Sequence, residues 1–575
     1  MYIRGHESPG ETHLSRKPAS DQYEARRKAL LESEKCLQPR NCKGVFETVL
    51  AYPSSYAAGM SSLGFQKVFS QLCSWPDTIC ERAFMPEADE IAWRRRTGRP
   101  VVTLETGRSI RNCDLLAFSI AYELDYLNAL VMLSISGIAP KAADRPDNWP
   151  IVIAGGLCLT ANPMPMAQFF DAIAIGESEP SLGPMLDTIK SLGSQGAGKK
   201  RILKMLSVLP GIYVPSIHGF VSPKAAVMRQ WASAESLPVN SCFVAPGSAL
   251  GDLMLLEISR GCPFNCRFCL PGYAYLPYRE ARIEDLQQAL ESLPKKSRVG
   301  IVACSPDSHP QFSDLVTMAR KRGHEVSIGS QRAEEPLQGR KSGFKGTTLT
   351  IAPETGSDSL RKVVGKSLKN DAILRTIDRM ARKVSRIKLY FIYGFPFETD
   401  EDRESIPLLI KEIRSRTKLP LSVSINPFVP KPWTAFQWMA LADPRLLRKW
   451  RDEISRALRR VPGLEVRFLG AREAHIQALL ARGDHRVADV LMNALSGNSW
   501  STAFSRAGID MGWVLTPLKP GAPFEWDFLN MGFGHTRLAR ELGLAISANQ
   551  ARLRPSSDRS SAQVPAEAGS QASCL

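Results

Sequence analysis

Three cysteines lie close together between residues 260 and 270. The segment EISRGCPFNCRFCLPG places Cys262, Cys266 and Cys269 with three and two residues between them, directly after an apolar, strand-like stretch. Thiolates are the usual protein ligands of iron–sulfur clusters, and a four-iron cluster held by three cysteines keeps one iron open. Structural zinc normally takes four ligands in two separated pairs, and no second pair follows at suitable spacing. The pattern therefore favours a 4Fe-4S cluster with one open iron.

Length and composition describe a large globular chain around this motif. With 575 residues, two or three domains are expected, and 44% hydrophobic and 23% charged residues are ordinary for folded proteins. No apolar run approaches the roughly 20 residues that span a bilayer, so we predict no membrane span. The first fifteen residues lack the apolar core of a secretory signal, which predicts a cytoplasmic protein. In that reducing compartment, twelve cysteines favour metal binding or chemistry over disulfides.

The chain is strongly basic, with 74 Lys and Arg against 57 Asp and Glu and a net charge of +17. Such a charge favours a polyanionic partner such as RNA or an acidic substrate, although a solvated basic surface explains it equally well. No RNA-binding motif such as a basic aromatic sheet signature is present. Nucleic acid therefore ranks below a small-molecule or peptide substrate.

Residues 46–240 alternate apolar runs with helix-like segments. The runs FETVLAYP, DLLAFSIAY, PIVIAGG and DAIAIGESEP are short and apolar, as expected for buried strands. The alternation is typical of a doubly wound parallel sheet, so we predict an α/β, Rossmann-like (flavodoxin-like) domain. Ligands of such sheets bind beyond the carboxyl ends of the strands. Residues 1–45 are charged and short of apolar periodicity, and they are predicted to form a polar N-terminal extension.

A second α/β series occupies residues 241–460. Its strand-like runs are LMLLEIS, VGIVACS, EVSIGS, TTLTIAPE, IKLYFIYG and LSVSINPF. Six such units predict a partial (β/α)6 TIM-type barrel, whose active residues would cluster at the carboxyl ends of the strands. Residues 461–547 predict a small, mostly helical C-terminal domain. The Ser, Ala, Gln and Pro bias of 548–575 predicts a disordered tail.

Beyond the cysteines, the chain resembles radical S-adenosylmethionine (radical SAM) proteins, and within them the uncharacterised fusion proteins with an N-terminal cobalamin-binding-like domain. The resemblance extends from about residue 46 to 542. It rests on LAYPSSYAAGMSSLG, AFSIAYELDYLN, VIAGGLCLTANPMP, AIGESEP, IGSQRAEE, LTIAPETGSDSLRKVV, KLYFIYGFPFETDED and INPFVPKPWTAFQW.

The resemblance implies cofactor-binding roles for particular residues. The three cysteines would hold the 4Fe-4S cluster, whose open iron binds S-adenosylmethionine. Ser305, Arg332 and Glu354 would face that molecule from successive strand ends, although Arg332 and Glu354 could instead form barrel salt bridges. The remaining implied positions lie near the adenine, where loop packing or a plain turn are the alternatives; they are Phe268, Gly394 and Pro396.

Cobalamin is the open question of the first domain. Proteins that coordinate cobalt from below use a histidine in an Asp-x-His-x-x-Gly loop, and this chain has no histidine between His13 and His218. Histidine-on binding is therefore excluded. Two interpretations stay open, which are cobalamin bound without a histidine ligand and a domain that has lost the cofactor. In either case the crevice would be lined by Gly59, Ser119, Glu123, Gly155 and Gly156.

These features predict a radical SAM enzyme that reductively cleaves S-adenosylmethionine to a 5′-deoxyadenosyl radical and modifies an unidentified substrate. Cobalamin would favour methyl transfer, and its absence would favour oxidation, cyclisation or rearrangement. An external donor such as flavodoxin or ferredoxin would supply the electron. The rival hypothesis is an RNA-binding protein with a structural iron–sulfur cluster.

Overall fold

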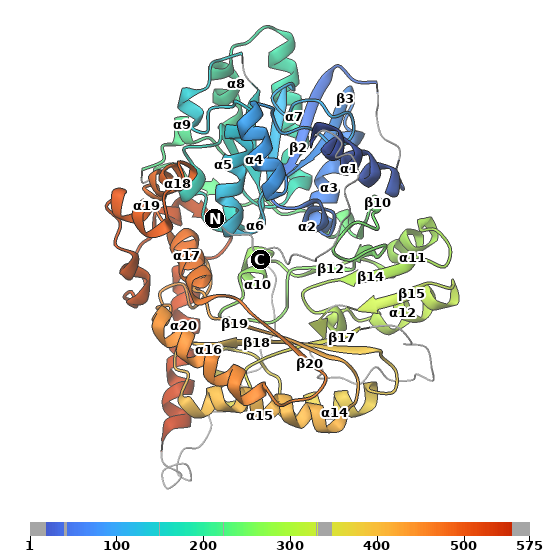
Figure 1. The fold of residues 1–575 in the computed structure, drawn as a ribbon, viewed down its shortest axis with the longest axis vertical. Coiled ribbons are helices and arrows are strands. Elements are labelled where there is room, and N and C mark those ends of the chain that lie inside the picture. The colour runs from blue at the N-terminus through green and yellow to red at the C-terminus, as the bar shows by residue number, and fades with distance from the viewer. Residues whose placement is uncertain are drawn as a thin grey trace, which may run out of the picture.

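The computed structural model describes residues 19–38, 43–148, 150–221, 223–328, 330–331 and 348–554. In Figure 1 the N-terminal domain lies at the top, the barrel lies below it, and the C-terminal helices run along one side of both. Within the described ranges, no helix is both long enough and apolar enough to cross a membrane. The predicted tail falls partly outside these ranges, because residues 555–575 are not described.

A six-stranded sheet forms the core of the N-terminal domain. Its order is β3-β2-β4-β5-β6-β7, and all neighbours are parallel except β6 and β7. The first five strands have the 2-1-3-4-5 order of flavodoxin-like folds, which confirms the predicted architecture. The strands are β2 (Phe46–Tyr52), β3 (Thr78–Phe84), β4 (Leu115–Ser119), β5 (Ile151–Gly155), β6 (Ala172–Ala174) and β7 (Ile212–Tyr213).

Helices cover both faces of this sheet. In β2, Val49 and Ala51 belong to one buried cluster, and Leu50 and Tyr52 belong to another, because successive side chains of a strand point to opposite faces. Because both faces of the strand are buried, its sequence is a nearly continuous apolar run. The helices are α3 (Leu63–Ser74), α7 (Ser178–Ser194) and α8 (Lys199–Leu206) on one face and α5 (Tyr126–Ile135) on the other.

The second unit is the predicted partial barrel. β11, β14 and β15 are parallel neighbours, and β16, β17, β18 and β19 continue the parallel series, with residue 329 between β15 and β16 not described. The six predicted strand positions are confirmed. They are β11 (Met254–Glu257), β14 (Arg298–Val302), β15 (Glu325–Ile328) with β16 (Ser330–Gln331), β17 (Thr348–Glu354), β18 (Arg386–Tyr393) and β19 (Leu421–Pro427).

One more strand extends this series. β20 (Leu464–Phe468) pairs in parallel with β19, beyond the predicted domain boundary at 460. Helices lie on the outer face of the barrel strands (Figure 1). They are α11 (Ile283–Ser292), α12 (Phe312–Lys321), α14 (Asn370–Met380), α15 (Asp400–Arg416) and α16 (Pro444–Leu458).

The C-terminal unit is mostly helical, as predicted. It contains α17 (Ala471–Arg482), α18 (Val487–Leu495), α19 (Trp500–Arg506) and α20 (His535–Leu553). Helix α20 continues past residue 548, where the disordered tail was predicted to begin. The tail prediction applies only to the residues after this helix.

Two short pairings join segments that are far apart in the chain. The segment between β7 and β11 is called the linker. β1 (Lys35–Cys36) pairs antiparallel with β10 (Phe243–Val244) of this linker, so the N-terminal extension is attached to it. β8 (Val227–Met228) in the same linker pairs with β21 (Leu529–Asn530) of the C-terminal unit. The linker is therefore fixed from both ends of the chain.

Candidate active site

The cysteine loop leaves the barrel at the carboxyl end of β11. It lies between β12 (Ser259–Arg260) and β13 (Arg279–Glu280), which pair antiparallel, and it leads into the short helix α10 (Leu270–Ala274). Gly261 begins the loop with φ of 82°, and a Cβ there would lie 2.7 Å from the carbonyl oxygen of Tyr275. Only glycine tolerates both conditions. The loop is thus held tightly where the strand ends.

The thiols of the loop are partly buried and close enough to influence one another. Burial raises the pKa of Cys269 well above its ordinary value, and the nearby Cys266 raises it further. Cys304, two residues beyond β14, is accessible to solvent but has many protein atoms around it, and this desolvation together with the nearby Cys262 raises its pKa to about 12. Among the described residues, no group of three or more His, Cys, Asp or Glu side chains is arranged to hold a metal ion.

The donor chemistry of the loop nevertheless fits an iron–sulfur cluster. Three partly buried thiols on one short loop are the ligand type that such clusters take. Gly272 packs beside the sulfur of Cys269, where a Cβ would make an ordinary van der Waals contact at 3.7 Å. Cys262, Cys266 and Cys269 remain the predicted ligands.

Phe268 packs in an aromatic group at the mouth of the barrel. Its ring meets that of Phe395 edge-on at 5.2 Å, and Phe395 lies 5.6 Å from Phe428. Phe395 belongs to the turn after β18, and Phe428 directly follows β19. This is the loop packing that was the alternative to an adenine contact. Through Phe268 this group packs on the cysteine loop.

The turn after β18 contains Gly394 and Pro396. Gly394 has φ of 75°, and a Cβ on it would lie 2.9 Å from the side chain of Leu447, so a glycine is required there. Its backbone N–H donates to Oε2 of Glu398 at 2.7 Å. Pro396 is partly buried in the same turn. The structure therefore shows a fixed strand-end turn, and the contact with adenine remains a prediction.

Glu398 is a feature of this turn that the sequence analysis missed. Its side chain is 1% exposed, and Oε1 has no hydrogen-bond partner among the residues that the structure describes. Burial raises its pKa to about 8, against the opposing influence of the Gly394 N–H and of Arg403. The signal available in the sequence was an acidic residue inside an otherwise apolar turn, YGFPFE.

The other residues expected to face S-adenosylmethionine have partners within the chain. Glu354 ends β17 and accepts from the ammonium of Lys366 at 2.7 Å, which is the barrel salt bridge considered as its alternative role. Its φ of 64° is unusual for a residue other than glycine and is typical of functional strand ends. Ser305 is buried and donates to Asp307 at 2.8 Å. Arg332 lies outside the described residues.

The predicted crevice of the first domain lies at the carboxyl ends of β4 and β5. Ser119 ends β4 and Gly155 ends β5. A Cβ on Gly156 would lie 2.1 Å from the carbonyl oxygen of Ile120, and one on Gly59 would lie 2.5 Å from the ring of Phe84. These glycines permit close packing within the domain, which is a structural role.

Glu123 connects this crevice to the other units. Its Oε1 accepts from the ammonium of Lys431 at 2.6 Å, and its Oε2 accepts from the amide of Gln477 at 3.0 Å. Lys431 follows β19 of the barrel, and Gln477 belongs to α17. Glu123 therefore bonds to residues of both the barrel and the C-terminal unit.

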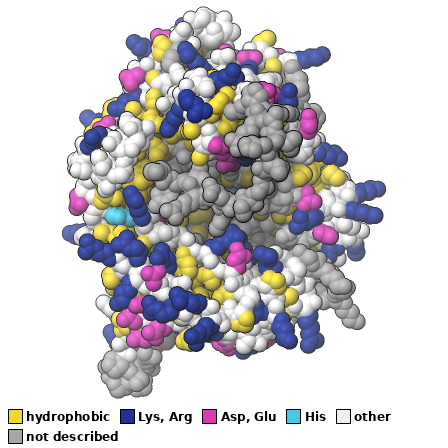
Figure 2. Space-filling model, viewed as in Figure 1, with side chains coloured by type: hydrophobic (Ala, Val, Ile, Leu, Met, Phe, Trp, Pro, Cys, Tyr) yellow, Lys and Arg dark blue, Asp and Glu magenta, His cyan; other side chains and the backbone are white. Residues whose placement is uncertain are grey.

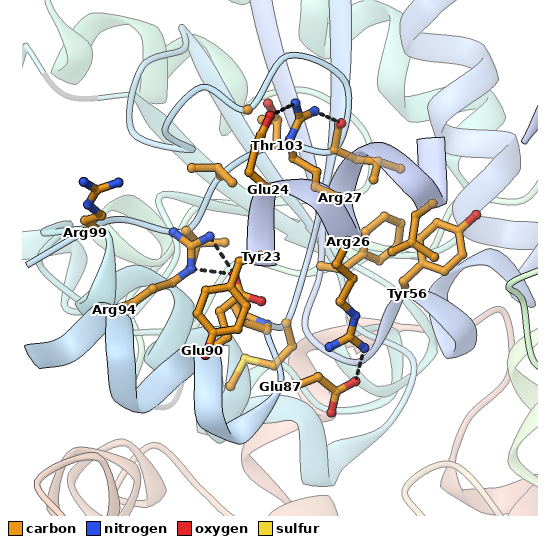
Figure 3. Close-up of a pocket in the computed structure, with 18 of the residues that line it drawn as sticks. Tyr23, Glu24, Arg26, Arg27, Tyr56, Glu87, Glu90, Arg94, Arg99 and Thr103 are labelled. Carbon is orange, nitrogen blue, oxygen red and sulfur yellow. Dashed lines mark hydrogen bonds and ion pairs between the residues drawn. The ribbon is translucent and has the colours of Figure 1, made fainter. Parts of the chain in front are cut away.

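A cavity of about 900 Å³ lies elsewhere, under α1 (Ala19–Ser33), at the edge of the N-terminal sheet (Figure 3). Six of its charged side chains form pairs, as the dashed lines in Figure 3 show, and the guanidinium of Arg99 lies over the ring of Trp93. The pairs are Arg26 with Glu87, Arg27 with Glu24 and Arg94 with Glu90. With these charges compensated, the cavity indicates no particular class of ligand.

On the face seen in Figure 2, the basic side chains are spread out and do not form one patch. Lys and Arg side chains extend on this face from the N-terminal domain to the barrel helices, with Asp and Glu among them (Figure 2). A solvated basic surface accounts for this distribution.

Comparisons with known proteins define the family. The model of the N-terminal region of radical SAM proteins matches residues 64–215, and that of the radical SAM superfamily matches residues 256–410. The uncharacterised protein MJ0966 of Methanocaldococcus jannaschii is 30% identical over 458 residues, which are 78% of this chain and 91% of that protein. The chain belongs to the radical SAM superfamily and is an enzyme of that superfamily, whose members use a 4Fe-4S cluster and S-adenosylmethionine.

Solved structures with similar folds are more distant. The cobalamin-dependent radical enzyme OxsB with aqua-cobalamin bound is 12% identical, with a TM-score of 0.45. The match covers 90% of this chain and 80% of the OxsB chain. The methyltransferase TsrM of Kitasatospora setae is 10% identical, with a TM-score of 0.42. The match covers 66% of this chain and 72% of the TsrM chain.

Proposed function

We propose that this enzyme reductively cleaves S-adenosylmethionine at a cluster held by Cys262, Cys266 and Cys269. The observation that carries the proposal is a loop with three partly buried thiols at the carboxyl end of a barrel strand, in a chain of the radical SAM superfamily. When bound, the cluster supplies one electron to the sulfonium. The carbon–sulfur bond then breaks to give methionine and a 5′-deoxyadenosyl radical, which takes a hydrogen atom from the substrate.

The residues of the barrel mouth would position and shield the reactants. The aromatic group of Phe268, Phe395 and Phe428 would keep water from the cysteine loop. Glu354 could accept from ribose hydroxyls or from the ammonium of S-adenosylmethionine, in exchange for or together with Lys366. The rigid turn at Gly394 and Pro396 would support the adenine. The substrate is proposed to be a small molecule or peptide, and the electron donor a flavodoxin or ferredoxin in the cytoplasm.

The fate of the substrate radical depends on the first domain. With cobalamin bound there, methyl transfer to the substrate radical would be the leading outcome. Without it, oxidation, cyclisation or rearrangement would follow. The contacts of Glu123 favour the second branch.

The activity can be tested by anaerobic reconstitution with iron and sulfide, followed by a strong reductant and S-adenosylmethionine. We expect 5′-deoxyadenosine, measured by chromatography. Protein that carries a full cluster yet yields neither 5′-deoxyadenosine nor S-adenosylhomocysteine would contradict the proposal.

The ligand assignment has its own test. Cys266→Ala should abolish the visible absorbance of the 4Fe-4S cluster and the formation of 5′-deoxyadenosine, because the loop would lose one of three thiolates. Cys113→Ala is a matched control, since Cys113 is also partly buried but lies in the N-terminal domain. A normal cluster spectrum in Cys266→Ala would refute the assignment.

A further inference from the structure

The carboxyl edge of the N-terminal sheet faces the rest of the chain. In flavodoxin-like folds, ligands bind beyond the strand ends at the point where the strand order reverses, which here lies between β2 and β4. The segment after β4 forms the turn η1 (Glu123–Asp125), and α17 packs on it. The segment after β5 forms α6 (Leu157–Ala161), and α10 packs on that helix. Elements of the barrel and of the C-terminal unit thus pack on the segments that follow β4 and β5.

Glu123 is the charged centre of this contact. Its side chain is 4% exposed, and each carboxylate oxygen accepts a bond from another unit of the chain, one from Lys431 and one from Gln477. Burial of a carboxylate is unfavourable unless its charge is paired and its oxygens accept hydrogen bonds. Here both conditions are met by the protein itself.

Buried polar groups around Glu123 extend the same contact. The indole N–H of Trp433 donates to the carbonyl of Ala161 at 3.0 Å. The side-chain amide of Asn162 donates to the carbonyls of Ala481 and Gly483 at 3.0 and 2.8 Å. Trp433 is 3% exposed and has φ of 58°, a conformation that a tryptophan keeps only when its surroundings fix it.

The loops of the domain itself are also closed over the strand ends. Gly156 lies against the backbone of Ile120, where even a Cβ would be 2.1 Å from the carbonyl oxygen. The thiol of Cys158 donates to the carbonyl of Ala121 at 3.0 Å, and the amide of Asn128 donates to that of Pro53. A corrin ring would have to break these contacts in order to lie on this edge.

The segment 431–438 that occupies the edge also reaches the cysteine loop. The backbone N–H of Phe436 donates to the carbonyl of Arg267 at 3.1 Å, and Arg267 stands between Cys266 and Phe268. Arg267 is itself fixed, because its guanidinium donates to the carbonyls of Lys362 and Val363. A continuous path of contacts therefore leads from Glu123 through this segment to the predicted cluster ligands.

From these contacts we infer that the first domain binds no cobalamin, and that its sheet edge instead holds segment 431–438 as a brace for the cysteine loop. Lys431 and Gln477 satisfy both oxygens of Glu123, a residue that was expected to line the cofactor crevice. Glu123, Lys431 and Trp433 are positioning residues. The inference that the first domain binds no cobalamin does not depend on the proposed function. The further conclusion does rest on it, namely that the substrate radical is oxidised, cyclised or rearranged.

The first test measures cofactor binding alone. Purified full-length protein is incubated with excess hydroxocobalamin, desalted, and its absorbance recorded in the corrin bands. We expect no retained cobalamin. Retention of one cobalamin per chain would overturn the inference and would leave the proposed cleavage of S-adenosylmethionine intact. Formation of 5′-deoxyadenosine is assayed separately, so failure of one proposal is distinguishable from failure of the other.

The second test measures the brace. Lys431→Met should lower the melting temperature, because it leaves Glu123 buried without its cation, and it should speed loss of the reconstituted cluster to a chelator by about tenfold, in the range of effects of residues behind metal ligands. Gln477→Met removes one neutral hydrogen bond and should act in the same direction more weakly. The control is Asp489→Asn, which removes the partner of Lys141 in an exposed ion pair between the same two units. Unchanged cluster loss in both Lys431→Met and Gln477→Met would overturn the brace.

Discussion

At the scale of residues, Glu398 has a distinctive environment. Burial raises its pKa to about 8, so between pH 4.5 and 8 the folded chain holds a proton that the unfolded chain releases. The free energy of unfolding should therefore fall as pH rises through this window. Glu398→Gln keeps an oxygen that can accept from Gly394 but cannot ionise, so its melting temperature should exceed that of the unaltered chain increasingly toward pH 8.

Thermal melts at pH 5 and pH 8.5 check this prediction. Glu412→Gln is the control, because Glu412 is exposed on α15. A difference between Glu398→Gln and the unaltered chain that does not change with pH would show that Glu398 is ionised throughout.

The sequence predicts some residues of the site better than others. The three cysteines stand out in the sequence by their spacing, because all three predicted ligand atoms belong to one loop. Glu354 was placed correctly at a strand end. Its ion pair with Lys366 could not be predicted, because Lys366 lies beyond a further helix and no sequence pattern links the two residues. Likewise, nothing near Glu123 indicates Lys431, which lies 308 residues away.

At the scale of elements, the turn after β5 depends on one glycine. Gly156 has φ of 128°, and a Cβ there would lie 2.1 Å from the carbonyl oxygen of Ile120. Gly156→Ala should therefore destabilise the chain by about 3 kcal/mol or more, because strain and a backbone clash add. Gly64→Ala is the control, since a Cβ on Gly64 in α3 meets nothing within 4 Å. Equal melting temperatures for the two variants would contradict the close approach.

Among the strands that escaped the sequence analysis, β3 and β20 are the longest, and each escaped for a physical reason. β3 carries Glu81 and Arg82 in its middle, and charged residues are unusual in a buried strand. Arg82 is nevertheless fully buried, because Glu34 and Glu105 pair with it at 2.6 and 2.7 Å. β20 alternates partly buried and exposed residues at the edge of its sheet, so it lacks the apolar run that marked the other barrel strands.

At the scale of the whole molecule, Glu177 joins the N-terminal domain to the barrel. Its carboxylate contacts Arg279 at 2.7 Å and Arg260 at 2.8 Å, on the two strands that flank the cysteine loop. Arg279→Ala removes one partner of this buried group and should cost about 3–5 kcal/mol. Arg282→Ala, which removes an exposed partner of Asp285, should change the stability little, because solvent screens such a pair. Denaturant titrations compare the two, and similar losses would show that the buried contact is not formed.

The division into an α/β domain, a barrel and a helical unit was predicted from alternating runs, because those patterns are local. How the units pack on one another was not predicted. That arrangement depends on pairs such as Glu177 with Arg279 and Glu123 with Gln477, whose members lie 102 and 354 residues apart. Such long-range pairs leave no periodic trace in the sequence.

The pairing of β8 with β21 sets an order of events during synthesis. Arg229, directly after β8, is fully buried and donates to the carbonyl of Met531, 302 residues further along. A ribosome adding about 5–20 residues per second needs roughly 15–60 s to make that stretch. For all this time the guanidinium lacks its final partner and the end of the linker stays open. The cysteine loop is therefore synthesised before β21, the strand that completes the pairing with β8.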